Sequence, residues 1–399
     1  MNREPLSLYL HIPFCSLKCA YCDFNSYAGL DDLVEPYCDA LISEMRLWGE
    51  VVGSGRPVST VFFGGGTPSL LPLTQVERIM AALRASFALE PDAEVSLEAN
   101  PGTVHLAYLR GLRAAGVNRI SFGVQSFHDG ELAALDRIHS AEEAAQCYRW
   151  AREAGFQRIN LDLIYGLSEQ PMERWQQTLE RAIHLAPDHL SAYALTVEEG
   201  TKLAYDIDRG RIPEPDGDMQ AEMYEWSCER LTRAGYRQYE ISNWARPGGE
   251  CRHNLVYWRN GEWLGLGAGA HSHWAGLRFA VVYSPRRYIE LVNAAAAAAL
   301  DAGPEPRQLL RRMSQVTYVE EQSPEAAMAD AAILGLRLNE GLDLTDFEER
   351  YGKPVDAAYG PALNEMTSAG LLERVNGLLR LTARGRLLAN EVFVRLLPD

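Results

Sequence analysis

The stretch YLHIPFCSLKCAYCDF, residues 9–24, decides the fold class of this chain. An apolar segment at residues 7–13 has the composition of a strand, and Cys15, Cys19 and Cys22 follow it at once in a C-x3-C-x2-C pattern. Three thiolates on one short loop can bind three irons of a [4Fe–4S] cluster and leave the fourth iron free for another ligand. Zinc is the alternative, but zinc prefers four ligands in paired motifs, and the sequence has no second pair. The sequence therefore predicts an iron–sulfur site directly after the first strand.

The other cysteines, Cys38, Cys147, Cys228 and Cys251, are scattered singly and form no disulfide framework. In a reducing compartment, clustered thiols are more often metal ligands or redox groups than disulfide bridges. The N-terminal stretch has neither the apolar centre of a secretory signal nor the length of a membrane-spanning segment. We therefore expect a cytoplasmic protein.

The composition is that of a soluble globular protein, with 47% hydrophobic and 23% charged residues. A length of 399 residues exceeds what one core usually organises, so we expect a large α/β unit with smaller additions. The net charge of −16 repels phosphate backbones unless basic residues cluster locally, so we expect no nucleic-acid partner.

Downstream of the cysteine motif, β-rich segments alternate with helical patterns. The segments lie at residues 7–13, 59–64, 94–100, 119–125, 157–165 and 189–196. Apolar strands in strict alternation with helices are typical of parallel strands joined by right-handed crossovers. Six such units predict a partial (βα)6 barrel of an α/β fold, which we assign to residues 1–235.

Beyond residue 196 the alternation ends. Residues 236–310 form an extension whose Gly- and aromatic-rich part is too irregular to assign to one element, with an alanine run at 294–299 that predicts a helix and a linker at 303–306. Residues 311–399 predict a mostly helical, winged-helix-like C-terminal domain. Its elements are helices at 325–338, 344–351, 357–369 and 383–396 and a hairpin at 371–381. The acidic balance favours a lid or docking role for this domain over DNA binding.

Polar residues end or follow the predicted strands of the barrel. Gly65 lies in a glycine-rich turn after the second strand, Glu98 and Gln125 end the next two, and Asp162 lies in the fifth. Since the carboxyl ends of barrel strands build the active site, we expect these residues to meet above the cysteine loop. A buried acid such as Asp162 needs a partner, and a donor-rich ligand such as a ribose would supply one. The alternatives are salt bridges within the barrel for the acids and a tight turn for the glycines.

Together these motifs resemble the radical S-adenosylmethionine superfamily, in its oxygen-independent coproporphyrinogen oxidase-like branch, and are most similar to the HemW-type heme chaperones. The resemblance extends over essentially the whole chain. Its further motifs are GGGTPS (64–69), SLEANPG (96–102), GVQSF (123–127), NLDLIYGL (160–167), CRHNLVYW (251–258), GLGAGAHSH (265–273) and LTARGRLLAN (381–390).

The resemblance implies that Cys15, Cys19 and Cys22 hold a [4Fe–4S] cluster. It also implies a set of S-adenosylmethionine contacts: Tyr9, Tyr21, Gly65, Gly66, Thr67, Glu98, Gln125, Arg137 and Asp162. Tyr21 would pack near the adenine, and the planar fork of Arg137 suits the methionine carboxylate. No residue is assigned a catalytic role.

Two features separate the chain from the oxidases of this branch. Phe24 stands where those oxidases have a further cysteine, and only eight residues precede Tyr9, where they carry an N-terminal extension. His253, Tyr257 and Trp258 match the HN-x2-YW signature of the chaperones and offer an imidazole beside two rings that could stack on a porphyrin, with Cys251 as a thiolate option. The alternative is a packed aromatic corner in which His253 is hydrogen-bonded internally.

Two other polar groups are interpreted as structural. We expect His271-Ser272-His273 to serve the fold and Glu198-Glu199 to form a solvated rim.

The resemblance implies a heme chaperone that binds the cluster, S-adenosylmethionine and heme as its cargo, and delivers heme to hemoproteins such as respiratory enzymes. It also implies a flavodoxin or ferredoxin as electron donor, peripheral membrane contact during delivery and a cluster-dependent dimer. We expect no coproporphyrinogen oxidase activity. The alternatives are a coproporphyrinogen III oxidase, a related radical methyltransferase and a DNA-binding redox regulator.

Overall fold

One twelve-stranded sheet organises the computed structural model, which describes residues 4–53, 55–296 and 305–398. Six of its strands are parallel neighbours in chain order, which confirms the predicted partial barrel. They are β1 (Leu6–Ile12), β4 (Pro57–Gly65), β5 (Ala88–Ala99), β6 (Arg119–Gln125), β7 (Arg158–Tyr165) and β8 (His189–Ala194).

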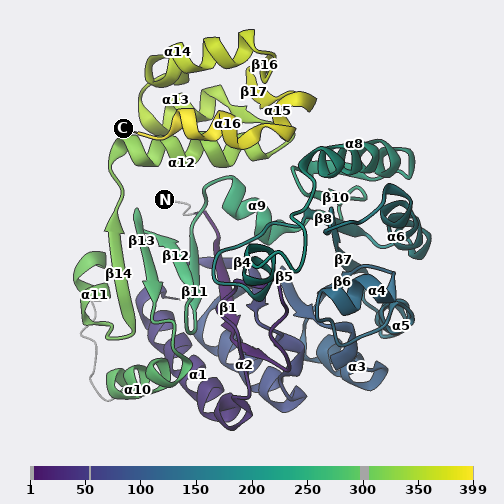
Figure 1. The fold of residues 1–399 in the computed structure, drawn as a ribbon. Coiled ribbons are helices and arrows are strands. Elements are labelled where there is room, and N and C mark those ends of the chain that lie inside the picture. The colour runs from purple at the N-terminus through teal and green to yellow at the C-terminus, as the bar shows by residue number, and fades with distance from the viewer. Residues whose placement is uncertain (1–3, 54, 297–304, 399) are drawn as a thin grey trace.

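Helices follow these strands and cover the outer face of the barrel (Figure 1). They are α1 (Val34–Val52), α2 (Leu73–Ser86), α3 (Leu106–Ala115), the short α4 (Asp129–Ala134), α5 (Ala141–Glu153), α6 (Met172–Leu185), the short α7 (Lys202–Asp208) and α8 (Gly217–Arg233). The start of α5 is a capping box, in which Ser140 accepts the N–H of Glu143 and the Glu143 carboxylate accepts the N–H of Ser140. Helix α3 ends at Gly116, whose φ of 108° favours glycine.

Strand β1 shows how the sequence divides the two faces of the barrel. Leu6, Leu8 and Leu10 are fully buried in the same apolar core as Trp48 of α1. Each buried leucine contributes about 1.5–3 kcal/mol relative to an exposed one. The alternate residues of β1, which include Tyr9, face the other side, so the strand's period of two sends polar groups into the barrel.

The extension, which the sequence left unassigned, continues the same sheet at both edges. Strands β10 (Asn243–Ala245) and β9 (Arg237–Glu240) add to β8. On the other side β11 (Trp263–Leu266) is parallel to β1, and three antiparallel strands follow it: β12 (His271–Trp274), β13 (Leu277–Val281) and β14 (Val316–Glu321). These strands are only three to six residues long, which is why no periodicity revealed them. A Cβ on Gly265 in β11 would lie 2.1 Å from the carbonyl oxygen of His271, so the close approach of β12 to β11 requires glycine.

Strand β14 belongs to the large sheet although it lies within residues 311–399, which the sequence assigned to the C-terminal domain. Before it come α10 (Pro285–Ala296) and α11 (Pro306–Arg312). The alanine run at 294–299 and the linker at 303–306 lie largely outside the described residues.

The C-terminal module has its own apolar core and a three-stranded sheet, as a winged-helix-like arrangement requires. Its elements are α12 (Pro324–Arg337), β15 (Leu342–Asp343), α13 (Leu344–Tyr351), α14 (Val355–Ser368), β16 (Leu372–Val375), β17 (Leu378–Leu381), α15 (Ala383–Leu387) and α16 (Ala389–Phe393). Helix α12 lies across the open side of the barrel, next to α9 (Arg252–Trp258) (Figure 1). An ion pair of 2.6 Å between Arg278 and Asp330 ties α12 to the sheet.

None of the helices in the described part of the chain combines the length and the apolar character that a bilayer crossing requires.

Candidate functional site

The three motif cysteines lie on the loop after β1, and the thiols are free. The loop is held by a short parallel pair, β2 (Phe14–Cys15) and β3 (Tyr27–Ala28). All three thiols line one cavity of about 520 Å³ at the carboxyl ends of the barrel strands. We refer to this space as the cysteine cavity.

The glycine-rich turn after β4 fixes the cysteine loop through its backbone. Gly66 N–H donates to Ile12 O at 2.8 Å, and Thr67 N–H donates to Phe14 O at 2.8 Å. A Cβ on Gly66 would come within 2.7 Å of the Phe14 carbonyl oxygen, so this approach requires glycine. The Thr67 hydroxyl lies 3.5 Å from the Cys15 sulfur. The turn therefore connects β4 to the next helix and also fixes the position of the cysteine loop through these hydrogen bonds.

Two buried acids lie across the cysteine cavity. The Asp162 carboxylate accepts hydrogen bonds from Ser121 Oγ and Asn160 Nδ2, both at 2.8 Å, yet burial still raises its pKa. Burial and the nearby Asp162 raise the pKa of Glu98 to about 8. Two acids that compete for ionisation in a buried site favour a cationic or donor-rich ligand.

Arg137 lines the same cysteine cavity as these acids. Its Nη1 lies 3.4 Å from the Cys19 sulfur, and its Nη2 donates to the Gly123 carbonyl at 2.7 Å. Its Nε is buried and has no hydrogen-bond partner among the described residues. Gln125 ends β6 with a φ of 68°, in the left-handed region, which turns the chain at the rim of the cavity. The unpaired guanidinium donor is the kind of group that an anionic ligand group would satisfy.

The donor set fits a [4Fe–4S] cluster better than a single metal ion. Within the described residues, no three His, Cys, Asp or Glu side chains are gathered around one ion position. The three thiols instead line one cavity, where each could supply the thiolate of a different iron. The remaining wall matches the S-adenosylmethionine contacts that the resemblance implied, which are Tyr21, Gly65, Gly66, Thr67, Glu98, Gln125, Arg137 and Asp162.

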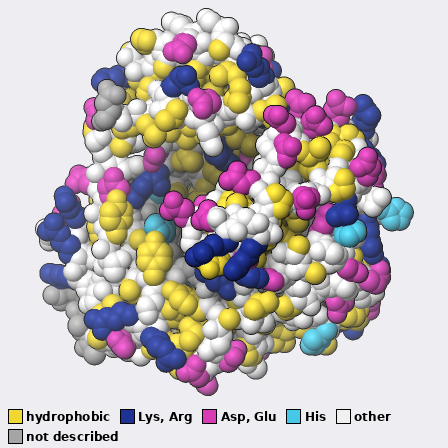
Figure 2. All heavy atoms as spheres, in the orientation of Figure 1, with side chains coloured by type: hydrophobic (Ala, Val, Ile, Leu, Met, Phe, Trp, Pro, Cys, Tyr) yellow, Lys and Arg dark blue, Asp and Glu magenta, His cyan; other side chains and the backbone are white. Residues whose placement is uncertain are grey.

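Tyr9 is the exception, because it lines a second cavity on the other side of Gly65 and Glu98. This cavity has a volume of about 890 Å³ and lies between the barrel, β12 to β14 and α12. Figure 2 shows the surface hollowed beneath the C-terminal module, with hydrophobic side chains inside the hollow. Its aromatic lining is Tyr9, Phe24, Tyr257, Trp258, Trp263 and Tyr283. We call it the aromatic cavity.

The structure corrects the expectation that His253 offers a free imidazole. The side chain is 1% exposed, and both ring nitrogens are engaged, Nδ1 with Thr60 Oγ1 and Nε2 with the Tyr257 hydroxyl, each at 2.8 Å. Burial lowers the pKa of His253 to about 3, so the ring is neutral. Iron ligation through either nitrogen would have to break the hydrogen bond that this nitrogen makes, and the geometry is that of the internally bonded alternative.

Cys251 is likewise no thiolate at a cavity wall. It is fully buried, and burial raises its pKa to about 12. Its thiol donates to Glu94, whose carboxylate also accepts the N–H groups of Arg252 and His253 and so fixes the start of α9. The motif thus positions Tyr257 and Trp258 at the aromatic cavity, while His253 supports Tyr257 from beneath.

Several lining residues were not predicted from the sequence. Tyr193 at the end of β8 lines the cysteine cavity, and Glu198 lies at its exposed edge, where the sequence placed a rim. Tyr283 and His271 line the aromatic cavity. The position of Tyr193 near the end of a predicted strand could have identified it. His271 and Tyr283 lie in the irregular extension, where no sequence pattern indicated a cavity.

Comparison with known proteins agrees with this geometry. Residues 9–182 match the radical SAM superfamily, and residues 322–388 match the HemN C-terminal domain. The heme chaperone HemW of Mycobacterium tuberculosis is 40% identical over 100% of this chain and 96% of its own length. The chain belongs to the HemW family within the radical SAM superfamily. The heme chaperone HemW of Bacillus subtilis is 36% identical, over 97% of this chain and 98% of its own length.

A solved structure of a related protein supports the fold over nearly the whole chain. The coproporphyrinogen III oxidase HemN from Escherichia coli superposes with a TM-score of 0.83 at 27% identity, covering 98% of this chain and 90% of that one. The HemW family therefore shares the architecture of an oxidase, and any functional difference must come from residues within a common frame.

Proposed function

We propose that this chain is a heme chaperone, which takes up heme beside a cluster site and passes it to hemoproteins. The observation that carries the proposal is the aromatic cavity. It adjoins the cysteine cavity through a common wall of Phe24, Gly65 and Glu98. Phe24 is 64% exposed, at the position where the oxidases of the branch carry a cysteine. An aromatic, half-open cavity suits a flat apolar macrocycle.

The cluster and its ligand belong in the cysteine cavity. Cys15, Cys19 and Cys22 would hold a [4Fe–4S] cluster, and Arg137 and Glu98 would bind the charged groups of S-adenosylmethionine. When bound, the pair supplies one-electron reductive cleavage of the sulfonium. The chain's own acids and guanidinium serve to orient the ligand, whether or not that chemistry proceeds.

The aromatic cavity would bind heme mainly through apolar contact. Tyr257 and Trp258 reach it from α9, and the Arg337 guanidinium stacks on the Trp258 ring, 4.4 Å from its centroid. His253 acts as a positioning residue, because its hydrogen bond fixes the Tyr257 hydroxyl. A cavity formed between two modules can open for release when α12 shifts.

The second candidate is a coproporphyrinogen III oxidase, and the fold shared with HemN favours it. The wide aromatic cavity would accept a tetrapyrrole in either case. The methyltransferase alternative has no comparable support. The DNA-binding alternative is disfavoured because arginines of the C-terminal module pair with acids, as in Arg374–Asp356, Arg380–Glu373 and Arg395–Glu365.

The proposed partners follow from the cargo. Acceptors are hemoproteins such as respiratory enzymes, and delivery to them involves contact with the membrane surface. A flavodoxin or ferredoxin would reduce the cluster, and dimer formation would depend on the cluster. The net charge of −16 is unfavourable for nucleic acid.

The test uses the protein reconstituted anaerobically with iron and sulfide. Heme is titrated in one arm, and coproporphyrinogen III with S-adenosylmethionine and a reductant is supplied in the other. We expect stoichiometric heme binding with a shifted Soret band and no protoporphyrinogen. Catalytic formation of protoporphyrinogen would replace the chaperone by the oxidase.

A further inference from the structure

His271 offers an imidazole that the fold leaves available. It is exposed at the start of β12 and lines the aromatic cavity. Its Nε2 lies 3.4 Å from the Tyr283 hydroxyl, at the long limit of a hydrogen bond, and its Nδ1 has no hydrogen-bond partner in the described part of the chain. From the sequence we interpreted this histidine as structural, but its side-chain contacts show no structural role.

The other histidine of the aromatic cavity is committed. His11 Nδ1 is hydrogen-bonded to the Tyr9 hydroxyl at 3.0 Å, and its Nε2 is hydrogen-bonded to the Asn25 carbonyl at 2.8 Å. His253 is buried beneath the wall, with both nitrogens bonded. No cysteine or methionine is among the described residues that line this cavity. Imidazole is a common protein ligand of heme iron, so His271 is the candidate that the cavity presents.

The surroundings of His271 suit a porphyrin. Phe24 and Tyr283 are 64% and 55% exposed at the cavity wall, an unusual state for large rings unless a ligand covers them. The Tyr283 ring meets His271 edge to face at 6.4 Å. Trp263 Nε1 donates to the His271 carbonyl at 3.0 Å, which fixes the backbone beneath the imidazole. Partial burial lowers the pKa of His271, which favours the neutral ring that can ligate iron.

We infer that the heme cargo occupies the aromatic cavity, with His271 as its axial ligand. This inference rests on the proposed function and adds to it the site and the iron-binding residue. The macrocycle lies against Phe24, Tyr257 and Trp258, on the far side of Glu98 from the cysteine cavity. The heme thus sits beside the cluster site without sharing its ligands.

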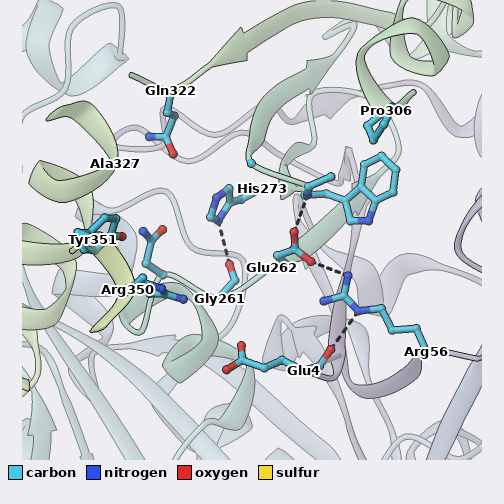
Figure 3. Close-up of a pocket in the computed structure, with 14 residues that line it drawn as sticks. Glu4, Arg56, Gly261, Glu262, His273, Pro306, Gln322, Ala327, Arg350 and Tyr351 are labelled. Atoms are coloured by element: carbon cyan, nitrogen blue, oxygen red, sulfur yellow. Dashed lines mark hydrogen bonds and ion pairs between the residues drawn. The ribbon is translucent and has the colours of Figure 1, made fainter. Parts of the chain in front are cut away.

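His273 provides a matched control two residues along β12. It projects from the same face of the strand, but it lines a different pocket of about 670 Å³ (Figure 3). There its Nδ1 donates to the Gly261 carbonyl at 3.0 Å. Charged groups of this pocket are bonded to one another, since Arg56 pairs with Glu262 at 2.5 Å and donates to the Glu4 carbonyl at 3.0 Å (Figure 3).

The experiment compares cluster-loaded parent, His271→Ala and His273→Ala proteins by absorbance and electron paramagnetic resonance of bound ferric heme. We expect His271→Ala alone to lose the histidine-ligated spectrum and to bind heme on the order of tenfold more weakly. Added imidazole should restore the parent spectrum in that variant. Iron content and melting temperature report on folding, and both should stay at the parent values because His271 is exposed.

The outcomes separate the inference from the proposed function. A parent that binds no heme would contradict both. Heme binding with a parent-like spectrum in His271→Ala would overturn the inference and leave the chaperone function standing. Loss of the spectrum in His273→Ala would assign the iron to another residue and overturn the inference as well.

Discussion

The two adjoining cavities differ in the way their walls are held. In the cysteine cavity, backbone hydrogen bonds from the glycine turn fix the cysteine loop, and a buried polar network fixes the wall around Asp162. The aromatic cavity is wider, lies between two modules and exposes large rings such as Phe24 and Tyr283. A rigid polar site suits a resident cofactor, whereas a looser apolar site suits a cargo that must leave. The following changes test this division.

The largest expected effect is at the cysteine loop. Replacement of Cys15, Cys19 and Cys22 by Ala together should abolish the iron–sulfur absorbance, because no other thiol lines the cysteine cavity among the described residues. Iron and sulfide content after anaerobic reconstitution measure this. Cys228→Ala, on α8, is the control and should keep the cluster. A cluster that survives the triple replacement would show that the cavity is not its site.

The next effect concerns the buried acid of the same cavity. Asp162→Ala should weaken S-adenosylmethionine binding about ten- to hundredfold, because hydrogen bonds to a charged group contribute about 1.5–3 kcal/mol. Isothermal titration on the cluster-loaded protein gives the affinity. Asp136→Ala, which removes a surface ion pair with Lys202, should leave it unchanged. Loss of iron with unchanged affinity for S-adenosylmethionine would mean that the role of Asp162 is misassigned.

A smaller effect is expected in the aromatic cavity. Trp258→Ala should lower heme affinity by about 1–3 kcal/mol through lost contact area, with the cluster intact. Trp150→Ala, on the outer helix α5, is the control for removing an indole. Heme titration followed at the Soret band measures both variants. Equal affinity in parent and Trp258→Ala would remove this ring from the heme site.

The smallest effect is a pH dependence that arises at Glu98, in the wall between the two cavities. Glu98 has a pKa of about 8 in the folded protein, above its ordinary value, so the folded state holds a proton that the unfolded state has lost. Its contribution to stability is therefore present at low pH and falls as the pH rises towards 8. In urea unfolding, the loss of stability from about pH 6 to about pH 8 should be smaller in Glu98→Gln than in the parent. Identical losses would contradict the assigned pKa.

The barrel and its polar rim could be predicted because each depends on local patterns. Strand period, glycine turns and the cysteine spacing all lie in short segments, and strand ends of a barrel converge by topology. The position of Glu98, Gln125 and Asp162 at the rim of the barrel could therefore be predicted from the sequence alone.

The aromatic cavity was not predictable from local patterns. Trp263, His271 and Tyr283 come from short strands and turns of the extension, and only the pairing of β11 with β1 brings them to the cavity. The prediction of a free imidazole at His253 was wrong for a different reason. The sequence shows that histidine is a possible iron ligand, but it does not show that hydrogen bonds to Thr60 and Tyr257 already engage both ring nitrogens. Tyr9, on β1, lines the aromatic cavity instead of the cysteine cavity, because the sequence does not show in which direction a side chain points.

The most direct test of the chaperone function is transfer of its cargo. The cluster-loaded protein carrying one heme is mixed anaerobically with the heme-free form of a respiratory hemoprotein, and the acceptor's spectrum is followed with time. The account predicts that the acceptor gains heme at a rate that rises with acceptor concentration, and that His271→Ala transfers less because it holds less. Release at a rate independent of the acceptor would contradict it, since heme would then simply dissociate into solution.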